Sequence, residues 1–164
     1  MTVRPLQHRH GFTMIEIVLV VIVIALALSV AAPSLTRWGQ GSKLDDAARQ
    51  FQAAAQFARS ESIANATPYR IEFDATGAGY SVLRYDGQFF QNVPGEFGQG
   101  ISVPSGFSIR LVQGGDANAL VFQPTGRTTP GTVRVTSPRN DTVDIASNYP
   151  SDLFRIVLSD EEAR

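Results

Sequence analysis

The sequence predicts an α+β protein in which a long N-terminal hydrophobic helix packs on a C-terminal antiparallel β-sandwich-like domain. Three observations predict this class. An uncharged apolar run extends from Ile17 to Ala32, and a helical period of apolar residues follows over 42–64. Short alternating segments separated by turn residues begin at Tyr69. A chain of 164 residues suits one globular domain with an anchor.

The first eleven residues are basic and contain no acid. Arg4 and Arg9 supply the charge, and Pro5 interrupts any local helix. A basic segment ahead of an apolar run is typical of a targeting leader, and its positive charges favour the cytoplasmic side of a membrane. We therefore expect residues 1–11 to be a cleaved basic leader peptide and the remainder to face the periplasm.

The apolar segment carries one acid at its head. Residues 12–32 number 21, which as a helix measure roughly 30 Å and match the hydrocarbon thickness of a bilayer. A carboxylate inside a bilayer costs at least ~2.5 kcal/mol, so Glu16 requires a partner or a function. Cleavage between Gly11 and Phe12 would create an α-amino group about one helical turn from Glu16. This amine, or the amine of a neighbouring copy, would be a suitable partner.

The stretch Gly11-Phe12-Thr13-Met14-Ile15-Glu16 resembles the processing site of the type IV pilin and pseudopilin family, written G|FTxxE. The resemblance implies that prepilin peptidase cuts after Gly11 and that Phe12 becomes N-methylated. It also implies that Glu16 recognises the Phe12 amine of an adjacent subunit during assembly. In this family the helix is a spine, so we expect residues 12–33 to form a transmembrane and assembly helix and residues 34–66 its periplasmic continuation.

Two other interpretations of the N-terminus remain open. An ordinary signal peptide also has a basic start and small residues near its cleavage site, here Ser29-Val30-Ala31. A plain single-span anchor is the other alternative. An acid at the head of a run longer than the usual ~7–15 residues favours the pilin-like interpretation. The mature N-terminal mass separates the three, because a start at Ala32 or an intact Met1 would contradict pilin-like processing.

Composition argues against catalysis. The chain has no cysteine, and both histidines, His8 and His10, lie in the leader. A processed chain would therefore lack the usual zinc ligands and the base of a serine or cysteine nucleophile. Fifteen acids leave a two-carboxylate glycosidase formally open. We expect a protein that is not an enzyme, with no catalytic residues, no cofactor and no assigned metal site.

Residues 42–64 have the pattern of an amphipathic helix. Ser42 with Asp45 and Asp46 in the next turn is typical of a helix start. One face is apolar at steps of three and four, through Leu44, Ala48, Phe51, Ala55 and Ala58. Gly39 and Gly41 predict either a local break or two tolerated weak points in one long helix, and we favour a continuous helix with a kink. Asn65-Ala66-Thr67-Pro68 predicts its end.

The remainder, residues 67–164, is predicted to be an antiparallel β globular domain. Residues 69–74 and 80–85 flank a Gly-rich turn and predict a hairpin. The segment 91–106 is rich in Gly and Pro and predicts a long loop, either a binding element or simply mobile. Further strands are expected at 88–91, 107–112, 119–122, 132–136, 142–145 and 153–158.

The stretch Leu120-Val121-Phe122-Gln123-Pro124-Thr125-Gly126, followed by a Gly-Thr-Val-Arg-Val strand, resembles the H-type minor pseudopilins and their FimT-like relatives. This resemblance implies a minor pseudopilin of a type II secretion system, which helps to export folded proteins across the outer membrane. Its implied partners are other pseudopilin subunits, the prepilin peptidase, the inner membrane and secreted cargo. The implied location is the inner membrane, crossed once, with the C-terminal domain in the periplasm.

An alternative is a FimT-like minor type IV pilin that acts in pilus assembly or DNA uptake. Arginines on the β region could contact phosphates: Arg110, Arg127, Arg134, Arg139 and Arg155. Against this, Gly126-Arg127-Thr128-Thr129 lacks the second arginine of the Gly-Arg-x-Arg motif in FimT-like DNA binders, and residues 159–164 are acidic. Nucleic acid is therefore not an expected partner. A third hypothesis, calcium binding near Asn140, Asp141 and Asp144, lacks an EF-hand pattern.

Overall fold

The computed structural model describes residues 13–115 and 118–157 of the chain. Contacts within the chain divide it into two compact units, Met1–Gly39 and Gln40–Arg164. One helix, α1, extends from Met14 to Ala64 and belongs to both units. The helix passes through Gly39 and Gly41 without interruption, so the local break considered there is not observed.

Thr13 is the residue that starts α1. Its side-chain oxygen accepts a hydrogen bond from the Glu16 backbone N–H at 3.3 Å, and its carbonyl accepts from the N–H groups of Glu16 and Ile17. A threonine before the first helical turn with a glutamate three residues later is a capping box sequence. Among the described residues, no helix is both long enough and apolar enough to cross a membrane.

The C-terminal end of α1 is closed by backbone hydrogen bonds. The N–H of Thr67 donates to the Ser62 carbonyl and the N–H of Ala66 to the Ile63 carbonyl. This pair of bonds is a Schellman motif, which needs a left-handed residue between helix and strand. Ala66 takes that position with φ of 51°. The predicted end of the helix at residues 65–68 is confirmed.

Within residues 13–115 and 118–157, nine short strands form two antiparallel sheets. Sheet A has the order β3-β2-β1-β6, with β4 also paired to β2, and sheet B has the order β5-β7-β8-β9. The strands are β1 (Tyr69–Phe73), β2 (Gly79–Tyr85), β3 (Phe90–Asn92), β4 (Ile101–Ser102), β5 (Ser108–Gly114), β6 (Ala119–Phe122), β7 (Gly131–Thr136), β8 (Thr142–Ser147) and β9 (Arg155–Val157). The predicted α+β class and the β1–β2 hairpin are confirmed.

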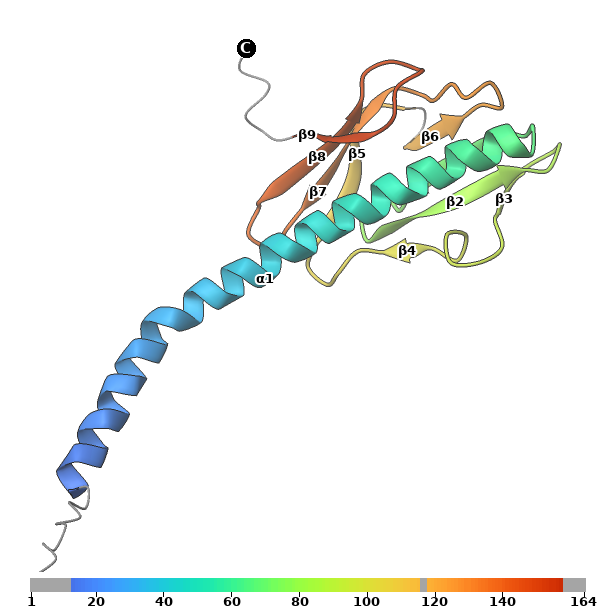
Figure 1. Cartoon of the computed structure of the whole chain (residues 1–164). Coiled ribbons are helices and arrows are strands. Elements are labelled where there is room, and N and C mark those ends of the chain that lie inside the picture. The colour runs from blue at the N-terminus through green and yellow to red at the C-terminus, as the bar shows by residue number, and fades with distance from the viewer. Residues whose placement is uncertain (1–12, 116–117, 158–164) are drawn as a thin grey trace, which may run out of the picture. The chain divides into compact units, whose positions relative to one another are not determined.

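The core lies between the C-terminal part of α1 and both sheets. All five residues of the predicted apolar face are buried, and Phe51 is their centre. Its ring meets Phe73 and Tyr80 of sheet A and Phe154, just before β9, at centroid distances of 5.4–5.8 Å. Figure 1 shows this part of the helix, coloured cyan to green, running alongside both sheets.

The segment predicted as a long loop is largely ordered by contacts with β2 and α1. In β2, the Val82 carbonyl accepts a hydrogen bond from the Val93 N–H, and the Val82 N–H donates one to the Phe97 carbonyl. The Phe97 ring stacks on Phe57 of α1 at 4.6 Å. The segment also contains β4, which the prediction missed. Gly79 allows β4 to approach, because a Cβ there would lie 2.2 Å from the Ile101 carbonyl oxygen.

Candidate assembly site

The predicted assembly residue lies in the first turn of α1. Glu16 follows the capping residue Thr13, and its side chain is exposed. A carboxylate in this position interacts favourably with the positive end of the helix dipole. Gly11 and Phe12, the predicted processing and methylation residues, lie outside the described residues. Thr13 was not predicted to act as a helix cap, although the Thr-x-x-Glu spacing carries that signal.

Large apolar side chains cover the N-terminal part of α1 and remain uncovered within this unit. They begin with Met14, which is 87% exposed, and the least exposed, Val20, is still 46% accessible. The set includes every residue from Ile17 to Ile24, so all faces of the helix are apolar there. A helix that is hydrophobic all round is stable when lipid or other apolar helices surround it. Glu16 is therefore an isolated charge at the head of a surface that requires a partner.

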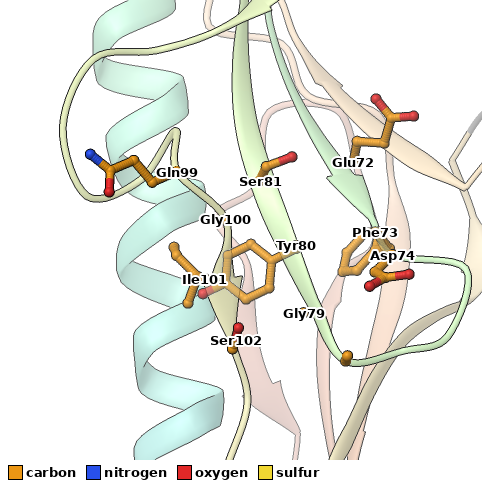
Figure 2. Close-up of a pocket in the computed structure, with 11 residues that line it drawn as sticks. Glu72, Phe73, Asp74, Gly79, Tyr80, Ser81, Gln99, Gly100, Ile101 and Ser102 are labelled. Atoms are coloured by element: carbon orange, nitrogen blue, oxygen red, sulfur yellow. The ribbon is translucent and has the colours of Figure 1, made fainter.

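Sheet A carries a hollow of about 400 Å³ near β4, lined by both polar and apolar residues. Figure 2 shows the carboxylates of Glu72 and Asp74 on one side of β2, and Gln99 and Ser102 on the other. Glu72 pairs with Arg70 at 2.5 Å, and Asp74 accepts the Thr76 N–H at 2.9 Å. These local bonds engage one oxygen of each carboxylate.

The aromatic ring of Tyr80 separates this hollow from the core. Tyr80 is 4% exposed, and burial raises the pKa of its hydroxyl above the usual value of 10.0. A phenol held neutral in this way packs as a hydrophobic group against Phe51. The residue therefore supports the fold, and its phenol stays protonated at neutral pH.

The structure separates the five arginines considered for phosphate binding. Arg110, Arg134 and Arg155 project from one exposed face of sheet B, as the strand registers place them. Arg127 and Arg139 lie in loops. Asp144 accepts two hydrogen bonds of 2.7 Å from Arg134, which neutralises the centre of the group.

Of the residues considered for calcium, Asn140 and Asp141 lie in the β7–β8 turn and Asp144 lies in β8. Asp141 accepts a hydrogen bond from the Ser137 hydroxyl at 3.2 Å, and Asp144 is paired with Arg134. Across the part of the chain that the structure describes, no three acidic, histidine or cysteine side chains group as metal ligands would. The turn is therefore assigned a structural role.

Sequence reasoning missed two polar residues of α1 that hold the connection between β8 and β9. The Gln52 amide donates to the Phe154 carbonyl at 2.9 Å. The Arg59 guanidinium donates to the carbonyls of Ser151 and Asp152 at 3.0 and 3.4 Å. All three carbonyls lie more than ninety residues away along the chain from the side chain that binds them. Helical periodicity places Gln52 and Arg59 beside the apolar face but contains no information about these partners.

Comparison with solved structures identifies the same fold in two kinds of minor subunit. The minor pseudopilin EpsH of the Vibrio cholerae type II secretion system is 14% identical, with a TM-score of 0.62 over 73% of this chain and 99% of that chain. A second EpsH structure gives 13% identity and a TM-score of 0.59, covering 71% of this chain and 94% of that one. The type IV minor pilin FimU of Pseudomonas aeruginosa is 17% identical, with a TM-score of 0.55 over 74% of this chain and 92% of that chain.

Comparison of the sequence with known protein families assigns this chain to one of them. No curated protein matches the chain. The family model described as type II transport protein GspH matches residues 47–149, which contain the C-terminal part of α1 and the strands from β1 to β8. Because this match covers more than half of the 164 residues, the chain belongs to the GspH family of type II transport proteins.

Proposed function

We propose that this protein is a minor pseudopilin, a structural subunit of the periplasmic pseudopilus that helps a type II secretion system to export folded proteins across the outer membrane. Family membership supports this function, and so does the fold shared with EpsH. The observation that carries the proposal is the N-terminal part of α1, where one carboxylate heads a helix with apolar side chains on all sides.

The N-terminal part of α1 serves two environments in this proposal. Before assembly, lipid of the inner membrane surrounds the apolar side chains and anchors the subunit, with the β domain in the periplasm. After assembly, the corresponding helices of other pseudopilin subunits surround them. Moving from lipid to these helices costs little free energy, because lipid chains and apolar side chains are similarly apolar surroundings. Prepilin peptidase removes residues 1–11 and the Phe12 amine is methylated, while Glu16 pairs with the amine of an adjacent subunit.

The β domain supplies contacts with neighbouring subunits or exported proteins and has no catalytic role. The composition supports this, because a processed chain lacks both histidine and cysteine. The hollow beside β4 supports it as well, since its carboxylates are held by Arg70 and by a backbone N–H.

Export provides the test of this function. In a strain lacking the gene, secreted enzymes should accumulate in the periplasm, and the wild-type gene should restore their release into the medium. A gene encoding Glu16→Gln, which keeps the size of the side chain and removes its charge, serves as the matched comparison. Normal export without the gene would contradict the proposal and favour the alternative supported by the FimU likeness, a minor type IV pilin.

A further inference from the structure

The connection between β8 and β9 buries few side chains of its own. Residues 148–153 read Asn-Tyr-Pro-Ser-Asp-Leu, a composition of turn-forming and polar residues, and we call them the strap. Tyr149 is 66% exposed and Leu153 is 43% exposed, and the residues between them are exposed or half-buried. The residues that flank the strap, Ser147 and Phe154, are both buried. The strap is therefore a weakly packed segment between two buried ends.

Hydrogen bonds to backbone carbonyls hold the strap against the rest of the domain. The Arg59 guanidinium of α1 donates to the carbonyls of Ser151 and Asp152 at 3.0 and 3.4 Å. The backbone N–H of Thr128 donates to the Pro150 carbonyl at 2.7 Å. Because Arg59 makes two of these three bonds, its side chain is the latch of the strap.

A buried hydroxyl beneath the strap opposes its closure. Thr128 is 3% exposed, and within the described residues its Oγ1 has no hydrogen-bond partner. The hollow beside it is lined by residues of α1 and β6 and by Asp152 and Leu153 of the strap, and it has no room for a water molecule. An unpaired buried hydroxyl raises the free energy of the folded state, because it has lost its bonds to water and gained no others. Lifting the strap would return water to this oxygen.

We propose that the strap opens and closes as a unit about its two buried ends, with Arg59 as the latch, while α1 and both sheets stay folded. Opening breaks the three hydrogen bonds from Arg59 and Thr128, exposes little apolar surface and hydrates the Thr128 hydroxyl. Segments with few buried apolar contacts open at a lower free energy than the core around them. Phe154 stays in the core, where its ring meets Phe51 and its carbonyl accepts a hydrogen bond from Gln52.

Opening of the strap changes which groups the domain presents to its surroundings. In the closed state, carbonyls of the strap occupy the Arg59 guanidinium and the Thr128 N–H. In the open state, these two donors and the Thr128 hydroxyl are available to acceptors in solution. The strap therefore controls access to a group of hydrogen-bond donors between α1 and the β6–β7 connection, and this device is independent of export.

Hydrogen exchange of two consecutive amides tests the strap in the full chain held in detergent micelles, with fragmentation mass spectrometry resolving single residues. The Thr128 N–H donates to the strap, whereas the Thr129 N–H donates to the Val121 carbonyl of β6 at 2.9 Å. After correction for intrinsic exchange rates, the Thr128 amide should exchange about tenfold faster than the Thr129 amide, or more. Equal rates would overturn the proposal, because both bonds would then open in one event.

A substitution at the latch should release the strap alone. Arg59→Met keeps an unbranched side chain and removes both donors, so the Thr128 amide should exchange about tenfold faster than in the wild-type chain. The Thr129 amide should keep its rate. Arg49→Met, at an exposed position of α1, is the matched control and should leave both amides unchanged. If Arg59→Met accelerates both amides equally, or neither, the strap does not open as a separate unit.

A second substitution acts in the opposite direction, so that a folding defect in Arg59→Met cannot decide the outcome. Thr128→Val replaces the unpaired hydroxyl by a methyl group and favours the closed strap. Exchange of the amide at residue 128 should then be about fivefold slower than in the wild-type chain, after the same correction. Thr128→Ser keeps the hydroxyl and should not slow this exchange. Exchange in Thr128→Val as fast as in the wild-type chain would contradict a hydroxyl that opposes closure.

Discussion

Ala66 is a residue whose backbone conformation opposes its side chain. It occupies the left-handed position of the Schellman motif at the end of α1, with φ of 51°. This conformation costs an L-residue about 1–2 kcal/mol, and glycine adopts it freely. We predict that Ala66→Gly raises the free energy of unfolding by about 0.5–1 kcal/mol, since the more flexible unfolded chain offsets part of the gain.

Thermal or denaturant unfolding of the two chains checks this prediction. Ala53→Gly is the matched control, because Ala53 is an exposed residue inside α1 where glycine costs about 1 kcal/mol. The two substitutions should therefore shift the unfolding midpoint in opposite directions. A loss of stability at both positions would show that the left-handed geometry of Ala66 carries no strain.

Glu16 is the residue on which assembly depends in the proposed function. We predict that Glu16→Ala is processed at close to the normal rate and enters pseudopili poorly, because the partner of the terminal amine is lost. Mass analysis reports the processing, and crosslinking of neighbouring subunits reports the incorporation. Glu16→Asp keeps the charge and should retain more incorporation than Glu16→Ala. Full incorporation of Glu16→Ala would contradict the role assigned to the carboxylate.

Gly11 controls maturation in the same proposal. Replacing it by leucine should block cleavage, because a bulky side chain at the cut is incompatible with the glycine-specific site that the family resemblance implies. The precursor should then keep the mass of residues 1–11 and an unmethylated Phe12. Thr2→Leu within the leader is the control and should be cleaved normally. A mature chain of unchanged mass from Gly11→Leu would place the cut elsewhere.

At the scale of elements, Phe51 joins α1 to both sheets. Its side chain is fully buried and meets rings from β1, β2 and the segment before β9. We predict that Phe51→Ala lowers the free energy of unfolding by about 3–5 kcal/mol, through lost transfer energy and the cavity that remains. Phe89, 68% exposed in the β2–β3 connection, should tolerate the same change within about 0.5 kcal/mol. Chemical denaturation measures both, and equal effects would reject this role of Phe51.

Periodicity correctly predicted those elements whose structure is determined by residues close to one another in the sequence. The face of α1 around Phe51 and the β1–β2 hairpin were correct because each is encoded within about twenty residues. Strand β4 was missed because it has two residues and depends on the space left by Gly79. The ordering of Phe97 was missed for a similar reason, since its partner Phe57 lies forty residues earlier and no local pattern connects them.

The same difference between local and distant sequence information applies to the functional residues. A short contiguous motif was sufficient to predict roles for Gly11, Phe12 and Glu16, which stay predictions. The arginines were noted as one group, and only the registers of sheet B show that Arg110, Arg134 and Arg155 share a face. A shift of one residue would have reversed that face, and sequence alone does not determine the register between distant strands.

At the scale of the whole molecule, the unit Gln40–Arg164 depends on contacts between its two ends. The Gln52 amide holds the Phe154 carbonyl across 102 residues, and the ring of Phe154 covers Phe51. A chain that leaves the ribosome from its N-terminus therefore exposes the core face of α1 until nearly the last strand is made. Throughout synthesis the chain has two uncovered apolar helix surfaces, and completion of β9 closes one of them.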